Sequence, residues 1–267
     1  MTYIKTYNNE KIAQEVVLRM ARKLKIYTLQ SSDFKSAWAK LLQQCLKNES
    51  PIRFGDENEP KALRGEICSK VALEGKAVEQ ILNGVQELGN DSRFHFGPGY
   101  IQKYVDEYTM DYIDWQRSLP DGHNQKFVYT YYERFRYYPA GTETFDQVEA
   151  LKQNLQKQIE YEIFSNRHQM TTWIPSIDAF SESPPCLQRI WISLIDKPLI
   201  EIHLDWRSRD LFGAWHVNLI ALINMINRDI ATPLNCKIAR IVDSCDSLHI
   251  YNGNWQEAQE AVKTFRL

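Results

Sequence analysis

The sequence predicts an α+β fold, because strand-like and helix-like segments occur in alternating clusters. Residues 186–195 and 199–206 alternate apolar and polar side chains as strands do, and the "DKP" between them is typical of a tight hairpin turn. Apolar residues recur instead at helical spacing through 142–166 and 211–231. The later segment "KIARIV" predicts another strand. We therefore expect helices packed on a sheet that is at least partly antiparallel.

Length and composition describe one large folded chain. With 267 residues, of which 43% are hydrophobic, the chain can bury a substantial core. The 32 Lys and Arg residues nearly balance the 34 Asp and Glu residues, and the net charge of −2 provides no basic field for a nucleic-acid polymer. An anionic partner must therefore be bound by local arginines.

The sequence shows no clear targeting or membrane-spanning signal. No apolar run reaches the ~18 residues of a membrane-spanning helix, and "MTYIKTYNNEK" lacks the apolar core of a signal peptide. We expect a soluble, cytoplasmic protein without a membrane partner. The five cysteines form an odd number without a CxxC pair, which favours reduced thiols over a disulfide frame or a zinc site.

The N-terminal part of the chain is expected to be helical. Residues 10–48 hold two helical patterns, and the second begins behind a capping residue, Ser32 or Asp33. We therefore expect 1–50 to form an N-terminal helical extension of a main domain at 51–267.

Three further segments carry clear local signals. The stretch 48–66 is rich in Pro, Gly and charge, which predicts a mobile loop. Helical spacing of apolar residues predicts a helix in 98–115. The segment 126–138 is dense in aromatic and β-forming residues and predicts a strand.

The polar side chains of 199–206 offer a metal site as a competing interpretation. Glu201, His203 and Asp205 share one strand face about 6.5 Å apart, and imidazole with carboxylates can bind zinc or iron. Three successive same-face side chains on a flat strand rarely converge on one ion. A polar sheet face or a subunit interface is therefore favoured, and no metal is expected.

Cys186 is the candidate nucleophile. A lone cysteine is most often a buried structural residue. Here, however, Pro184 and Pro185 fix the backbone and place the thiol at the mouth of a strand. A thiol needs a nearby cation to react at neutral pH, and Arg207 lies across the predicted hairpin.

A polar cluster follows the second strand of this hairpin. Arg207, Ser208 and Arg209 combine guanidinium donors with a hydroxyl, which suits a phosphate or a carboxylate. A solvated charge cluster is an equally good explanation. Asp210 and Asn218 could read the edge of a heterocycle by paired hydrogen bonds, or they could cap the helix that follows.

With these residues in place, the chain resembles thymidylate synthases and the related pyrimidine-nucleotide hydroxymethylases, and among them the short archaeal-type branch. The resemblance covers about 60–265 and is carried by "PPC" at 184–186, "RSRDLFGAWHVN" at 207–218 and "SLHIY" at 247–251. It implies a twisted mixed β-sheet covered by helices, a catalytic domain in 51–267, and a homodimer joined through the sheet face.

The resemblance also implies roles for residues around the nucleotide. Cys186 would add to C6 of the pyrimidine ring, and Asn218 would read the base. Glu107 and Tyr131 are candidates for the proton-handling network near C4 and C5. Asp210 would bond the pterin of a reduced folate.

The remaining implied roles concern the phosphate and the sugar. Arg207 and Ser208 would hold the 5′-phosphate, Arg64 would reach it from the 48–66 loop, and Arg167 would reach the phosphate bound by the partner subunit. The 3′-hydroxyl of the sugar would be contacted by His249 and Tyr251.

Three functions follow from the resemblance. The leading expectation is methylation of dUMP to dTMP, with 5,10-methylenetetrahydrofolate or a related reduced pterin as co-substrate. The first alternative is a 5-hydroxymethylase acting on dUMP, dCMP or CMP, in which water quenches the intermediate. The second alternative is a nucleotide-binding protein without turnover, although binding alone does not require a thiol.

The sequence ends soon after Tyr251, whereas common members of the family have a long C-terminal tail that closes over the folate. Another element would then have to exclude water from the reaction. The loop at 50–65 is the expected candidate.

Overall fold

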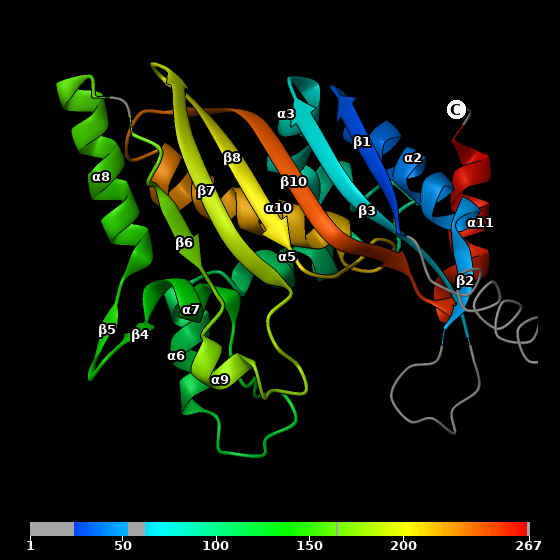
Figure 1. Cartoon of the computed structure of the whole chain (residues 1–267), viewed down its shortest axis with the longest axis horizontal. Coiled ribbons are helices and arrows are strands. Elements are labelled where there is room, and N and C mark those ends of the chain that lie inside the picture. Colours follow the sequence, from blue (N-terminus) through cyan, green and yellow to red (C-terminus); the bar gives the residue numbers. More distant parts are fainter. Residues whose placement is uncertain (1–23, 53–61, 164, 266–267) are drawn as a thin grey trace, which may run out of the picture.

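A computed structural model describes residues 24–52, 62–163 and 165–265 of the chain. Its centre is an eight-stranded mixed sheet in the order β1-β3-β10-β8-β7-β6, with β2 paired to β3 and β9 paired to β10 (Figure 1). The α+β expectation is confirmed. The strands of this sheet are β1 (Lys25–Ser31), β2 (Glu49–Ile52), β3 (Ala62–Glu74), β6 (Gln169–Thr171), β7 (Leu187–Asp196), β8 (Leu199–Trp206), β9 (Arg209–Asp210) and β10 (Lys237–Ile250).

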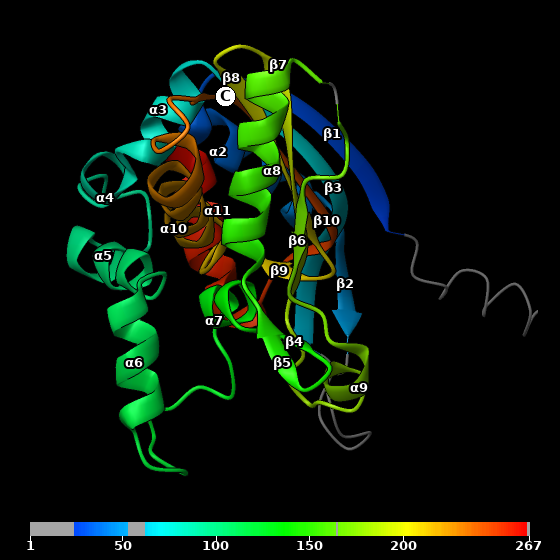
Figure 2. The same ribbon diagram turned by 90° about the vertical axis from the view of Figure 1, so that its left-hand side faces the viewer.

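Helices cover one face of this sheet. Figure 2 shows α10 and α11 on one side of the strands, and Figure 1 shows α10 crossing β7, β8 and β10. A two-stranded sheet of β4 (Tyr138–Ala140) and β5 (Glu143–Phe145) lies apart. The helices are α2 (Phe34–Lys47), α3 (Lys76–Leu82), α4 (Gly84–Glu87), α5 (Pro98–Asp106), α6 (Met110–Ser118), α7 (Tyr131–Arg136), α8 (Gln147–Tyr161), α9 (Pro175–Asp178), α10 (Trp215–Ile226), η1 (Asn227–Ala231), η2 (Asn252–Asn254) and α11 (Trp255–Thr264).

The best-patterned segments fold as predicted. In β8, every second side chain from Ile200 to Trp206 is at most 2% exposed, because this face packs on the helical layer. The central helix α10 is apolar almost all round and is buried along nearly its whole length. In α2, Asp33 accepts a hydrogen bond from the Ser36 backbone N–H at 2.8 Å and so caps the helix as expected.

The predicted strand at 126–138 is wrong. Its centre forms the helix α7, and only its last residue enters β4. The hydroxyl of Thr130 accepts a hydrogen bond from the Glu133 backbone N–H at 3.1 Å and caps this helix. Tyr132 and Phe135, three residues apart, are both buried, so helical packing prevails over the β-propensity of the aromatic residues.

The N-terminal part is more than a helical pair. Its strand β1 pairs in parallel with β3 and extends the main sheet, which the sequence reading missed. The first helical pattern of 10–48 lies largely outside the described residues, as do residues 53–61 of the expected loop.

Arg64 lies in β3 and not in a loop, which corrects its expected location. The strand begins at Ala62, where it pairs with β2, and from Gly65 onward it also pairs with β10. Gly65 allows a close approach to α2, since a Cβ at this position would lie 2.4 Å from the Cys45 carbonyl oxygen.

The polar side chains of β8 bind their neighbours. His203 and Arg240 both bond the carboxylate of Glu201, and Asp205 accepts a hydrogen bond from Arg189 Nε at 2.8 Å. Within the described ranges, no group of three or more His, Cys, Asp or Glu residues could hold a metal ion. Nor is any described helix long and apolar enough to cross a bilayer.

Candidate active site

Strand directions bring the motif residues to one edge of the sheet. Cys186 directly precedes β7, and β8 runs antiparallel to β7 and ends at Trp206, next to Arg207 and Ser208. Because β10 runs parallel to β8, its last residues, among them His249, reach the same edge. Chain segments far apart in sequence therefore meet at this edge of the sheet.

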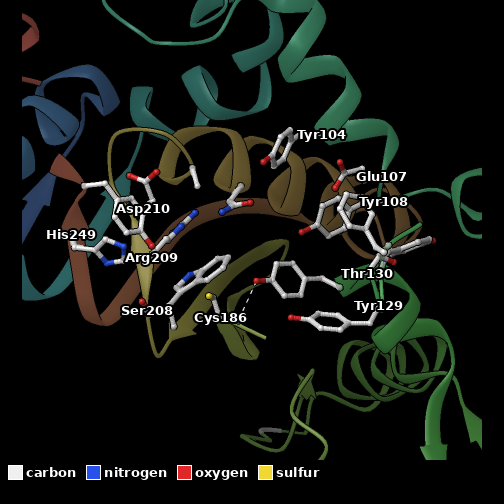
Figure 3. A pocket seen from close by; sticks show the side chains of 17 residues that line it. Tyr104, Glu107, Tyr108, Tyr129, Thr130, Cys186, Ser208, Arg209, Asp210 and His249 are labelled. Carbon is white, nitrogen blue, oxygen red and sulfur yellow. Dashed lines mark hydrogen bonds between the residues drawn. The ribbon is translucent and has the colours of Figure 1, made fainter. Parts of the chain in front are cut away.

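A cavity of about 360 Å³ opens there. Figure 3 shows Asp210 and His249 at one end of it, Glu107 and Tyr108 at the other, and Cys186 between them. The lining residues are Tyr104, Glu107, Tyr108, Phe127, Tyr129, Thr130, Tyr131, Tyr132, Cys186, Trp206, Ser208, Arg209, Asp210, Ala214, Asn218, His249 and Tyr251. Eight of the eleven site residues expected from the sequence are among them.

Cys186 is held by Arg207. The guanidinium donates from Nη2 to the Pro184 carbonyl oxygen at 2.6 Å and from Nε to the Pro185 carbonyl oxygen at 3.0 Å. The same Nη2 lies 3.8 Å from Cys186 Sγ. The arginine therefore fixes the proline turn and also places a cation next to the sulfur.

The other four thiols have environments that oppose reaction. Burial raises the pKa of Cys45, Cys68, Cys236 and Cys245, and Cys186 alone of the described cysteines lines this cavity.

The acid and phenol groups come from the helical side. Glu107, directly after α5, has its pKa raised to about 7 by burial, so it exchanges a proton near neutral pH. The Tyr131 hydroxyl accepts hydrogen bonds from the backbone N–H groups of Cys186 at 3.3 Å and Leu187 at 3.4 Å. Burial raises the pKa of Tyr131 and keeps the phenol protonated.

Asp210 and Asn218 enter the cavity from the start of α10. Asp210 Oδ1 accepts hydrogen bonds from the Phe212 and Gly213 backbone N–H groups at 3.0 and 3.1 Å, and burial raises the pKa of this carboxyl group. Gly213 leaves room for the carboxylate, because a Cβ there would lie 2.5 Å from Oδ2. Asp210 thus braces the turn before the helix and also lines the cavity.

The rim beside β10 is a polar cluster. Arg64 Nη2 donates to Ser247 Oγ at 3.1 Å, and its Nε lies 3.2 Å from Glu66 Oε2. The Arg64 guanidinium carbon is 5.6 Å from the centre of the Tyr251 ring, against which His249 packs edge-on. Arg64 therefore stands next to a lining residue without lining the cavity itself.

Arg167 lies elsewhere. Its side chain is exposed two residues before β6, and it is not among the lining residues of the cavity. Within one chain, the structure does not bring Arg167 to the other motif residues.

Arg209 differs from its expected place in an anion cradle. Its side chain is 1% exposed, and Nη1 lies 2.7 Å from Oδ1 of the fully buried Asp243. The positive charge is therefore already matched by a carboxylate. The sequence reading missed Asp243, and the available signal was an acidic residue directly after the apolar residues Ile241 and Val242.

The fold and the cavity together define a protein that presents a thiol, a proton-exchanging carboxyl group and an amide in one cavity. The family model "Thymidylate synthase" matches residues 4–265. This chain belongs to the thymidylate synthase family. Membership implies a folate-dependent one-carbon transferase that binds a pyrimidine nucleotide and uses methylenetetrahydrofolate as co-substrate.

The names of similar proteins are consistent with membership of this family. A protein named "Putative thymidylate synthase" from Methanothermobacter marburgensis is 26% identical over 254 residues, which cover 89% of this chain and 98% of that protein. One of the same name from Methanosarcina barkeri is 30% identical over 154 residues, covering 56% and 65%. A "Thymidylate synthase" from Streptococcus pneumoniae is 24% identical over 231 residues, covering 82% and 79%.

Proposed function

We propose that this chain methylates dUMP to dTMP, with 5,10-methylenetetrahydrofolate or a related reduced pterin as co-substrate. The observation that carries the proposal is the cavity that holds Cys186, Asn218 and Glu107 together, with Arg207 next to the sulfur. A nucleophile, a base-reading amide and a proton-exchanging group are the parts that addition to a uracil ring requires.

The chain's own groups account for the handling of the nucleotide. The Cys186 thiolate adds to C6, and the negative charge that develops spreads over C5 and O4. Glu107, protonated below about pH 7, can donate a hydrogen bond to O4 and stabilise that charge. C5 then bonds to the one-carbon unit as one of that carbon's two bonds to folate nitrogen breaks. C5 loses its proton as the second carbon–nitrogen bond breaks, and the hydride reduces the methylene carbon as the thiolate leaves C6.

The reduced folate supplies the one-carbon unit and the hydride when it is bound. Asp210 suits a pterin, because its carboxylate lines the cavity and is braced by two backbone N–H groups. Gly213 keeps the space beside this carboxylate open.

Gly213→Ala should weaken use of the folate selectively. The new methyl group would displace the Asp210 carboxylate, and misplacing a positioning group can cost on the order of 10- to 100-fold in rate. Steady-state kinetics should show the KM for the folate raised and the KM for dUMP nearly unchanged. An equal rise of both KM values would contradict a pterin role for Asp210, and Gly253→Ala, where a Cβ meets open space, is the matched control.

Asn218→Asp should change the base preference. The amide can accept from N3–H of uracil and donate to O4, whereas cytosine presents the opposite pattern, which a protonated aspartate can match. We expect the ratio of kcat/KM for dCMP to that for dUMP to rise by about 100-fold. Competition between the two nucleotides in one reaction measures this ratio directly, and an unchanged ratio would show that Asn218 does not read the base.

The same proposal includes a homodimer through the sheet face opposite α10. It is supported by the exposure of Arg167, which could then reach the phosphate bound by the partner subunit. Sedimentation of the wild type and turnover of Arg167→Ala test it together. A monomer with full activity would remove Arg167 from the site.

The decisive experiment is mass spectrometry of the nucleotide after incubation with methylenetetrahydrofolate and, separately, dUMP, dCMP and CMP. A methyl group adds one carbon and no oxygen, whereas a hydroxymethyl group adds both. Methylated dUMP supports the proposal, and a hydroxymethylated product replaces it with the hydroxymethylase alternative. No product, with nucleotide still bound, favours a binding protein.

A further inference from the structure

A buried ion pair holds two tryptophans beside the cavity. Asp243 Oδ1 accepts from Arg209 Nη1 at 2.7 Å and from Trp206 Nε1 at 3.0 Å, while Oδ2 accepts from Trp215 Nε1 at 2.7 Å. The guanidinium carbon of Arg209 lies 3.9 Å from the centre of the Trp206 ring, and its Nη2 donates to the Trp215 carbonyl oxygen at 2.7 Å. One carboxylate thus orients three large side chains.

The first tryptophan leads to the nucleophile. Trp206 lines the cavity and pairs with Leu187, the residue after Cys186, in the β7–β8 register. Its ring meets the Tyr131 ring edge-on at 6.0 Å, and the Tyr131 hydroxyl accepts from the Cys186 backbone N–H. A shift of the Trp206 side chain would therefore change the position of the Cys186 thiol.

The second tryptophan leads to the base-reading amide. Trp215 is the first residue of α10, and Asn218 follows three residues later, about one helical turn on. The Arg209 bond to the Trp215 carbonyl oxygen and the Asp243 bond to its indole fix the start of this helix. Asp243 thus connects the nucleophile, through Trp206, with the base-reading residue, through Trp215.

We propose that Arg209 and Asp243 are positioning residues for the one-carbon transfer and set the spacing of Cys186 and Asn218 through Trp206 and Trp215. The inference rests on the proposed function. Buried ion pairs are weak contributors to stability, because the loss of hydration offsets much of the attraction. Their hydrogen bonds are directional, however, so they fix the orientation of each indole ring. A preorganised site requires side chains that are fixed in this way.

The test uses two variants that avoid an unmatched buried charge. Arg209→Lys keeps the charge but loses the planar fork that bonds Asp243 and the Trp215 carbonyl together. The double variant R209M/D243N removes both charges. The control is R93M/D91N, which removes another arginine–aspartate pair, 2.6 Å apart, that does not line this cavity.

Each variant is titrated with 5-fluoro-dUMP and the folate, so that kcat is expressed per site able to form the covalent adduct. We expect kcat per titrated site to fall on the order of 100-fold in R209M/D243N and less in Arg209→Lys, with the control close to wild type. A purely structural role would lower the number of active sites and leave kcat per site unchanged, and that result, in either test variant, would overturn the inference.

Two readouts need no turnover and so separate this inference from the proposed function. The first is the rate at which iodoacetamide alkylates Cys186, and the second is quenching of tryptophan fluorescence on dUMP binding. If the wild type forms no product, the proposed function fails, and unchanged alkylation and quenching in Arg209→Lys and R209M/D243N would then also refute the positioning role. Altered values in folded variants would retain it.

Discussion

Cys186→Ser is expected to lower turnover by a factor of about 10⁴ or more, because the hydroxyl of serine stays protonated where a thiol ionises. The geometry explains why no other thiol should substitute. Arg207 Nη2 stands 3.8 Å from this sulfur, and the remaining described thiols have pKa values raised by burial. The measurement is the rate of dTMP formation, together with the mass of the protein after treatment with 5-fluoro-dUMP and the folate.

The control for this variant is Cys68→Ser. Cys68 is partly exposed, as Cys186 is, but it lies in β3 and outside the cavity lining. It should retain wild-type turnover and form the adduct. Full turnover by Cys186→Ser, or an adduct mapped to another cysteine, would refute the nucleophile assignment.

Glu107→Gln is expected to lower kcat/KM for dUMP by about 10²- to 10⁴-fold at pH 6, the range typical of general acid–base catalysis. Burial raises the pKa of Glu107 to about 7, so the protonated form that donates to O4 is depleted as pH rises through 7. In the wild type, kcat/KM plotted against pH should therefore decrease on an alkaline limb near pH 7. The variant should lack this limb, because a carboxamide does not titrate.

The same carboxyl group affects folding. Its folded pKa of about 7 lies above the ordinary glutamate pKa of 4.5, so the unfolded chain releases this proton at a lower pH than the folded chain does. The contribution of Glu107 to the free energy of unfolding is fully present below pH 4.5 and is lost as pH rises through 7. Urea unfolding at several pH values should show this slope in the wild type and not in Glu107→Gln. The exposed Glu87→Gln is the control, and a slope unchanged by Glu107→Gln would contradict the burial argument.

The sequence predicted those parts of the fold in which local pattern and tertiary burial agree. The alternation of β8 and the apolar surface of α10 both describe faces that are buried in the structure. The pattern failed at 126–138, where a threonine cap and two buried aromatic residues outweigh β-propensity. It also missed β1, whose place in the sheet depends on pairing with a strand about forty residues later.

The site was predictable where one motif supplies several groups and less so where partners come from distant strands. Cys186, Asp210 and Asn218 were singled out from two short motifs, 184–186 and 207–218, and all three line the cavity. The environment of Arg209 was not, because it depends on Asp243 in another strand. Charge matching of this kind is a property of the folded chain and leaves no local pattern.

The hydrogen bonds of Tyr131 leave its hydroxyl as a hydrogen-bond donor toward the cavity. Its oxygen accepts from two backbone N–H groups, those of Cys186 and Leu187, so the phenolic hydrogen is the group left to point elsewhere. Tyr131 should therefore act only as a hydrogen-bond donor toward a ligand in the cavity. A ligand that places an N–H group next to the Tyr131 hydroxyl would bind weakly, whereas one that places a lone pair there would accept a hydrogen bond. The backbone of the nucleophile's own turn thus selects among ligands before the thiol reacts.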